Sequence, residues 1–286
     1  MLLLLNRIIL VVFISLFSFS TSSEEVKSEF IKTKWSFEGI FGTFDRASLQ
    51  RGYQVYQEVC SGCHSVQHLS YRNLSEKGGP EFSTEEAKAI AAQFEVEDGP
   101  NSDGEMFMRP GRLSDKFVKP YPNVEASTAA NGGAYPPDMS VLAKARAGGA
   151  DYIYSLLLGY EEAPTGFELD DGVYYNKYMP GNKIKMSAPL SDGLVEYSDS
   201  TQATTAQMAK DVTTFLVWAA EPHLEAQHRM GFKAIIYLII LFTLVYMSKQ
   251  KVWSQFTSKK EPEEDTFDKV ERTVTEYEGE DPKTFK

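Results

Sequence analysis

The sequence predicts a mainly α-helical protein with long irregular loops and one transmembrane helix near its C-terminal end. Several segments place apolar residues at helical spacing behind N-cap signals. Stretches dense in Gly, Pro, Asn and Asp separate these segments. A late apolar run, from Ala234 to Met247, contains no charge. With 286 residues, 42% of them hydrophobic, the chain is long enough for one large domain or two modest ones.

The N-terminal segment has the pattern of a secretory signal peptide. Arg7 provides a sparse positive region, residues 8–17 are apolar, and small serines follow. We predict a signal peptide over residues 1–23, cut between about Ser20 and Ser23. The alternative is an uncleaved anchor helix, but the apolar run is shorter than the ~20 residues that a membrane-spanning helix needs.

The first helix of the exported part is predicted over residues 44–64. Asp45 or Ser48 can cap it. Gly52 lies inside it at a cost of up to ~1 kcal/mol relative to alanine, which the close approach of another helix would offset. Apolar residues recur at helical spacing, namely Leu49, Tyr53, Tyr56 and Cys60.

The next segment is predicted to be a short helix followed by a long irregular stretch. Ser83 and Glu86 form a capping box for a helix that should end near Phe94. Residues 95–137 are rich in turn formers, and irregular segments of that length are usually functional or disordered. Apolar residues are interleaved with the turn formers and indicate loops that pack against another surface. These residues are Met106, Phe107, Met108, Phe117, Tyr121 and Tyr135.

Two further helical regions are predicted, with turns between them. Residues 138–160 should form two helices broken at Gly148-Gly149, and a short hairpin is expected from Val173 to Tyr178. A capping box of Thr204 with Gln207 begins an amphipathic helix that packs in the core, against the helix that contains the mid-helix glycine. Its apolar stripe consists of Met208, Val212, Phe215, Leu216 and Ala219.

The C-terminal part is predicted to cross a membrane once. Residues 230–248 are just long enough for a spanning helix, although a buried soluble helix is the alternative. Lysines follow it, so the positive-inside rule places residues 249–286 in the cytoplasm and the domain of residues 24–229 outside, in the periplasm. The acidic tail is predicted to be disordered. The net charge of −11 disfavours nucleic acid and suits basic protein partners.

Cys60, Cys63 and His64 form a C-x-x-C-H segment, and the chain has no other cysteine. This is the attachment sequence of haem c, because two thiols one helical turn apart can add to the vinyl groups on one porphyrin edge. The imidazole that follows then lies beneath the iron. The alternatives are a disulfide, a thioredoxin-like dithiol and a zinc site, which would need about four ligands.

A second axial ligand for such an iron would be a methionine. His68 lies on the same side of the haem as His64, and His223 and His228 lie beside the membrane segment. Spacing leaves five candidates, of which Met186 and Met179 share a flexible Pro/Gly-rich loop: Met106, Met108, Met139, Met179 and Met186. An iron with two protein ligands has no open site, which favours an electron carrier without catalytic residues of its own.

An ordered series of segments resembles the cytochrome c1 family over about Trp35 to Trp253. The matching segments are RGYQVYQEVCSGCHS, GEMFMRPGRLSD, KPYPN, ANGGAYPPDMS, ARAGGADYIYSLLLGY, PTGFELDDGVYYN, MPGNKIKMSAPL, AKDVTTFLVWAAEPH and RMGFKAIIYLIILFTLVY.

The resemblance implies a class I-like cytochrome c domain with one covalent haem c on Cys60 and Cys63. It implies that His64 and Met186 are the axial ligands, in preference to Met179, and that the segment from Tyr135 to Pro137 forms part of the pocket. Many relatives carry an arginine near a haem propionate where this sequence has Thr128. We expect that difference to bear on the reduction potential.

The resemblance also implies a role and partners. The chain would be a subunit of ubiquinol–cytochrome c reductase (complex III) in the cell inner membrane, next to cytochrome b in a dimeric complex. It would take electrons from the Rieske iron–sulfur protein and pass them to a cytochrome c, while the whole complex translocates protons. A haem c subunit of a terminal oxidase and an exported thiol oxidoreductase are the alternatives.

Overall fold

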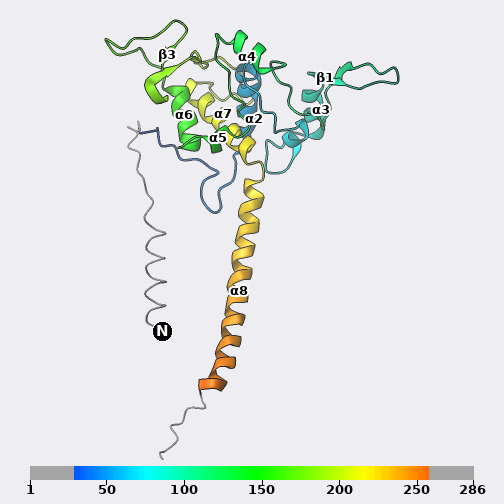
Figure 1. The fold of residues 1–286 in the computed structure, drawn as a ribbon, viewed down its shortest axis with the longest axis vertical. Coiled ribbons are helices and arrows are strands. Elements are labelled where there is room, and N and C mark those ends of the chain that lie inside the picture. The colour runs from blue at the N-terminus through cyan, green and yellow to red at the C-terminus, as the bar shows by residue number, and fades with distance from the viewer. Residues whose placement is uncertain (1–28, 258–286) are drawn as a thin grey trace, which may run out of the picture. The chain divides into compact units, whose positions relative to one another are not determined.

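The computed structural model describes residues 29–257 and confirms the mainly helical fold (Figure 1). The chain divides after Glu225 into two units, a domain and the C-terminal helix. The predicted signal peptide lies outside the described residues. The elements are, in chain order, α2 (Arg46–Val55), the π-helix η1 (Tyr56–Cys60), the 3₁₀ helix η2 (Tyr71–Ser75), α3 (Thr84–Ala91), β1 (Glu95–Asp98), β2 (Phe107–Pro110), α4 (Val124–Ala130), α5 (Leu142–Ala145), α6 (Gly149–Leu158), β3 (Tyr174–Tyr175), the 3₁₀ helix η3 (Pro180–Asn182), β4 (Lys183–Ile184), α7 (Thr205–Ala220) and α8 (Leu224–Thr257).

Helices α2 and α7 form the centre of the domain, where they lie side by side (Figure 1). The mid-helix Gly52 makes their close approach possible. A Cβ at this position would lie 2.1 Å from the Asp211 carbonyl oxygen and 2.8 Å from the Phe215 Cβ. The predicted apolar stripe of α7 is buried, with Met208 and Phe215 fully inside. Both predictions, that a helix approaches Gly52 and that this helix is α7, are confirmed.

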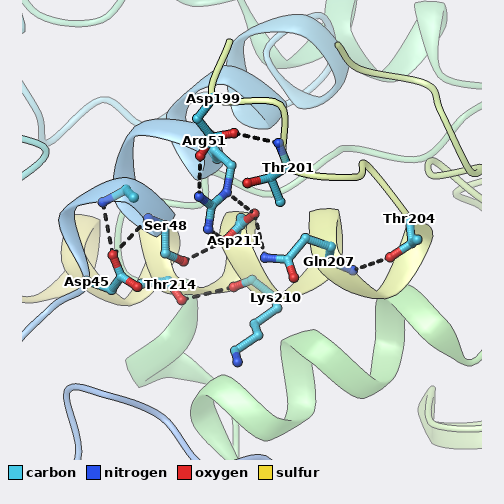
Figure 2. A network of polar contacts seen from close by, with 11 residues as sticks. Asp45, Ser48, Arg51, Asp199, Thr201, Thr204, Gln207, Lys210, Asp211 and Thr214 are labelled. Atoms are coloured by element: carbon cyan, nitrogen blue, oxygen red, sulfur yellow. Dashed lines mark hydrogen bonds and ion pairs between the residues drawn. The ribbon is translucent and has the colours of Figure 1, made fainter. Parts of the chain in front are cut away.

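A buried charge network also joins these two helices (Figure 2). The side chain of Asp211, on α7, has no exposed surface. Its carboxylate accepts hydrogen bonds from the Ser48 hydroxyl at 2.7 Å and from Arg51 Nε at 2.8 Å, both on α2. Arg51 also donates to Asp199 at 2.7 Å. The Asp211 hydrogen bond raises the pKa of Arg51, so the guanidinium stays charged.

The sequence signals located the helix starts correctly and the helix ends less well. Asp45 caps α2 and Ser83 caps α3 through the expected capping box. The predicted first helix is wrong beyond Val55, because the chain widens there into the π-helix η1 and the hydrogen bond from Ser61 N reaches Tyr56 O at 2.8 Å. Helix α3 ends at Ala91 rather than near Phe94.

The long irregular stretch contains more regular structure than predicted. Strands β1 and β2 pair antiparallel, with Glu95 opposite Pro110 and Asp98 opposite Phe107. Helix α4 follows and is capped by Asn123. Burial alternates between exposed and half-buried residues along β1 but not along β2, and no residue of either four-residue strand is fully buried, so the period-2 signal of a half-buried strand is weak here.

Helices α5 and α6 confirm the break at Gly148-Gly149. The hairpin predicted from Val173 to Tyr178 is wrong in its extent, because β3 pairs with β4 and the turn between them runs through residues 176–182.

Thr204 caps α7 as predicted. The prediction that the Gln207 side chain completes a capping box with Thr204 is wrong, because its amide donates to Asp211 at 3.0 Å instead.

Helix α8 is the one helix within residues 29–257 that is long and apolar enough to cross a membrane. It extends past the predicted span of residues 230–248 on both sides. The prediction of disorder from residue 249 is therefore wrong for residues 249–257, which continue the helix. The charged and polar residues at positions 249–257 are compatible with a helix because this stretch contains no Pro or Gly.

Gly52→Ala should destabilise the domain, because the new methyl group would overlap the Asp211 carbonyl oxygen. Overpacking of this kind costs about 2 kcal/mol, which for a domain of this size lowers the thermal midpoint by roughly 4–8 °C. Circular dichroism of the detergent-solubilised protein measures it. Gly231→Ala is the matched control, since that helical glycine has open space around it. Equal midpoints for the two variants would contradict the close helix contact.

Asp211→Asn should remove the charge that compensates the buried guanidinium of Arg51. Breaking one partner of a buried ion pair costs about 3 kcal/mol or more. By contrast, Asp199→Asn should cost less than about 1 kcal/mol, because that carboxylate is 40% exposed. Denaturant unfolding of both variants gives the comparison, and a larger loss at Asp199 would show that the network is organised differently.

Candidate functional site

The C-x-x-C-H segment lies where η1 ends and the chain makes a tight turn. Cys63 N and His64 N both donate to the Cys60 carbonyl oxygen, at 3.1 and 2.9 Å. Both cysteines are free thiols, Cys60 partly exposed and Cys63 exposed. The turn therefore brings the two thiols and the imidazole together, as the sequence predicts.

The Cys60 thiol is poorly suited to redox exchange. Burial raises the pKa of Cys60 to about 12, and the neighbouring Cys63 adds to the effect. Reactive cysteines of dithiol oxidoreductases have lowered pKa values, because the thiolate is the nucleophile. The local environment of Cys60 thus disfavours the thioredoxin-like alternative.

The imidazole of His64 is held in a defined tautomer. Its Nδ1 lies 2.8 Å from the Pro137 carbonyl oxygen, which can only accept a hydrogen bond, so Nδ1 carries the proton. The other nitrogen, Nε2, then keeps its lone pair. Burial lowers the pKa of His64, which favours the neutral ring. A backbone carbonyl that fixes a histidine in this way is typical of metal-ligating histidines.

Asp138 holds the two segments of the site together, and sequence reasoning missed it. Its carboxylate accepts hydrogen bonds from the Ser65 hydroxyl at 2.7 Å, from Gln67 N at 3.0 Å and from Ser140 N at 2.8 Å. Burial opposes its ionisation, but these hydrogen bonds outweigh burial and lower the pKa of Asp138. The residue therefore stays charged and keeps the Pro137 carbonyl next to His64.

A hollow opens beside the turn, between Cys63 and the segment of residues 119–136. Tyr135 and Pro136 line it, from the segment that the resemblance assigns to the pocket wall. Thr128, the position noted for its departure from relatives, lies on α4, part of the same wall. Two free thiols, an oriented imidazole and an adjoining hollow fit a porphyrin attached at this turn.

The methionine candidates differ in what surrounds them. The Met179 sulfur accepts a hydrogen bond from the Tyr152 hydroxyl at 3.8 Å, and Met139 is buried in the core. Met106 and Met108 are more than half exposed in and next to strand β2, on the hairpin. Met186 is partly exposed, between the buried Met139 and the exposed Met106 and Met108.

The segment of Met186 is hydrogen-bonded to the loop that follows α4. Lys185 Nζ donates to the Gly132 carbonyl oxygen at 3.0 Å, just after α4. The Tyr160 hydroxyl donates to the Met186 carbonyl oxygen at 3.1 Å. Within residues 29–257 no hydrogen bond joins Met186 to the Cys60–His64 turn. The structure therefore places the first three predicted site residues in one tight turn and the fourth on a separate segment.

A mainly helical domain with a C-x-x-C-H turn, followed by a helix that could cross a membrane, is typical of c-type cytochromes. The Cytochrome C1 family model matches residues 35–256. The chain therefore belongs to the cytochrome c1 family, haem proteins that carry electrons in the cytochrome bc1 complex.

The relatives span bacteria, plants and fungi. The chain is 50% identical over 240 residues to "Cytochrome b/c1" of Bradyrhizobium diazoefficiens. This match covers 77% of this chain and 35% of that protein. It is 50% identical over 226 residues to "Cytochrome c1-2, heme protein, mitochondrial" of Solanum tuberosum, covering 79% of this chain and 86% of the relative. The "Cytochrome b-c1 complex catalytic subunit, mitochondrial" of Candida albicans is 48% identical over 227 residues, or 79% and 78% of the two chains.

Asp138→Ala should loosen the site without touching the cysteines. Three hydrogen bonds to a charged acceptor are lost, and water replaces part of each, so we expect a loss of about 2–3 kcal/mol in the free energy of unfolding. Guanidinium unfolding of the purified protein measures it. Asp103→Ala, an exposed aspartate on the hairpin, is the control and should change stability by less than about 0.5 kcal/mol. Equal effects would contradict the role assigned to Asp138.

Proposed function

We propose that this chain is the electron-transfer subunit of a quinol:cytochrome c oxidoreductase and carries one covalently bound haem c. The observation that carries the proposal is the orientation of His64, whose Nδ1 is taken by the Pro137 carbonyl directly after two free cysteines. Membership of the cytochrome c1 family supports the same conclusion. The Candida albicans relative is named as a catalytic subunit of the cytochrome b-c1 complex.

Each site residue has a distinct role in this proposal. Cys60 and Cys63 would hold the haem through thioether bonds, and His64 Nε2 and the Met186 sulfur would ligate its iron. The bound haem supplies reversible one-electron chemistry. Burial keeps the imidazole neutral by lowering the pKa of His64, while the Pro137 carbonyl fixes its orientation. Lys185 holds the Met186 segment to the loop after α4. With His64 and Met186 as ligands, the iron would have no open position for a substrate.

The partners follow from the family and the charge. We propose that electrons arrive from the Rieske iron–sulfur protein and leave to a cytochrome c, within a dimeric complex that contains cytochrome b and couples the transfer to proton translocation. A net charge of −11 suits electrostatic steering of a basic acceptor. It also makes a role in nucleic-acid binding unfavourable.

The proposed location is the cell inner membrane. Residues 1–23 would be the signal peptide, residues 24–229 the periplasmic haem domain, and the span would lie within α8. Lys249 and Lys251 follow the apolar run and favour a cytoplasmic C-terminus. Thr128 in place of the arginine found in many relatives would leave the nearby propionate less compensated, which favours a lower potential.

Purification in mild detergent from a host that attaches haem c tests the proposal. The preparation should show a sharp low-spin α band in the reduced-minus-oxidised spectrum, and the pigment should survive acid–acetone extraction. Cytochrome b and an iron–sulfur protein should come down with it. A colourless protein would refute the haem assignment, whereas recovery with oxidase subunits would favour the terminal-oxidase alternative.

Met186→Leu should remove the thioether ligand from the iron. We expect the reduction potential to fall by a sizeable part of the roughly 0.8 V range that axial ligands control, and the opened position should bind carbon monoxide. Potentiometric titration and carbon monoxide difference spectra measure both effects. Met179→Leu is the matched control and should change neither; the reverse pattern would move the ligand to Met179.

A further inference from the structure

The main chain at Met186 is bonded to a side chain that is distant in the sequence. The Tyr160 hydroxyl lies 3.1 Å from the Met186 carbonyl oxygen, across 26 positions of the chain. A carbonyl oxygen can only accept a hydrogen bond, so the hydroxyl is the donor. The bond is partly buried, which limits competition from water. It therefore ties the Met186 backbone to a point outside its own loop.

The stretch around Met186 has little support of its own. No helix or strand covers residues 185–204. Within the part of the chain that the structure describes, residues 185–190 take part in no backbone–backbone hydrogen bond. The bond from Lys185 to the Gly132 carbonyl is made by a long, exposed side chain, for which water competes. The position of the Met186 backbone thus depends mainly on the tyrosine hydroxyl.

Tyr160 is itself firmly placed. It pairs with Asn176 in an antiparallel bridge, and beside this bridge Lys177 N donates to the Gly159 carbonyl at 2.9 Å. Asn176 is fully buried, and its Nδ2 donates at 2.8 Å to the carbonyl of Leu156, near the C-terminal end of α6. Tyr160 therefore extends a framework that is built on α6, and its hydroxyl is a fixed anchor for the Met186 loop.

We propose that Tyr160 is a positioning residue for Met186, whose carbonyl it holds so that the thioether stays on the iron and other ligands are disfavoured. The proposal rests on the proposed function, in which Met186 ligates the haem iron. A neutral side chain is not held on a metal by charge, so its retention depends on the groups that orient it. Loss of one neutral hydrogen bond shifts such an equilibrium by about fivefold.

Imidazole competition in the haem-containing, full-length protein tests this proposal. In the oxidised protein, imidazole displaces the sulfur and abolishes the far-red charge-transfer band that methionine gives to ferric haem c. Tyr160→Phe removes the hydroxyl and keeps the ring, so imidazole should bind about fivefold more tightly than to the wild type. Tyr154→Phe is the matched control, because the ring of this half-buried tyrosine packs on Trp35, and it should leave the imidazole affinity unchanged.

Two further variants separate positioning of the ligand from general loosening of the domain. With Met186→Leu the thioether is already absent, so the addition of Tyr160→Phe should not change the imidazole affinity further. 4-Aminophenylalanine at position 160 keeps a hydrogen-bond donor, although a weaker one. Its imidazole affinity should lie between those of the wild type and Tyr160→Phe, and it carries the test alone if Tyr160→Phe does not fold.

The other outcomes would overturn the proposal. Equal imidazole affinities for Tyr160→Phe and Tyr154→Phe would do so, as would an effect of Tyr160→Phe that persists with Met186→Leu. If Tyr160→Phe does not fold, a wild-type affinity with 4-aminophenylalanine overturns it. These results, in a wild type that shows the far-red band, refute the positioning role alone. A wild type that carries haem but lacks the band refutes Met186 as a ligand, and the positioning role with it.

Discussion

The close contact between α2 and α7 at Gly52 is the constraint on which the rest of the structure depends. The Asp211 carbonyl occupies the space where any other residue would place its Cβ. The side chain of the same aspartate accepts hydrogen bonds from α2, so steric fit and charge fix the same pair of helices. Since α2 runs directly into η1 and the cysteines, this contact also fixes where the site begins.

The site is completed by a segment distant in the sequence. The Pro137 carbonyl determines which nitrogen of His64 carries a proton, and Asp138 holds that carbonyl in place through hydrogen bonds to Ser65 and Gln67. The imidazole is thus prepared for a metal by backbone and carboxylate groups that are not themselves ligands. A rigid, prepared ligand suits an electron carrier, because little rearrangement then accompanies each change of charge.

Local signals in the sequence predicted local structure well. Asp45, Ser83 and Thr204 cap the helices as expected, since a cap depends on residues a few positions away. The packing of α7 against Gly52 could be predicted because a glycine is unfavourable inside a helix and because α7 has an apolar stripe that needs a partner. The π-helix η1 and the β1–β2 hairpin were missed, because neither leaves a clear periodic pattern. Asp138 was missed because its role depends on contacts 71 and 73 positions away, and spacing alone left Met186 and Met179 as alternatives.

The central claim is that one haem is bonded to both cysteines of the turn. Tryptic digestion of the purified protein followed by mass spectrometry tests it most directly, on the peptide that follows Arg51 and ends at Arg72. The account predicts one peptide that carries a single haem on Cys60 and Cys63 together. The same peptide with free thiols, or with a disulfide and no haem, would contradict it.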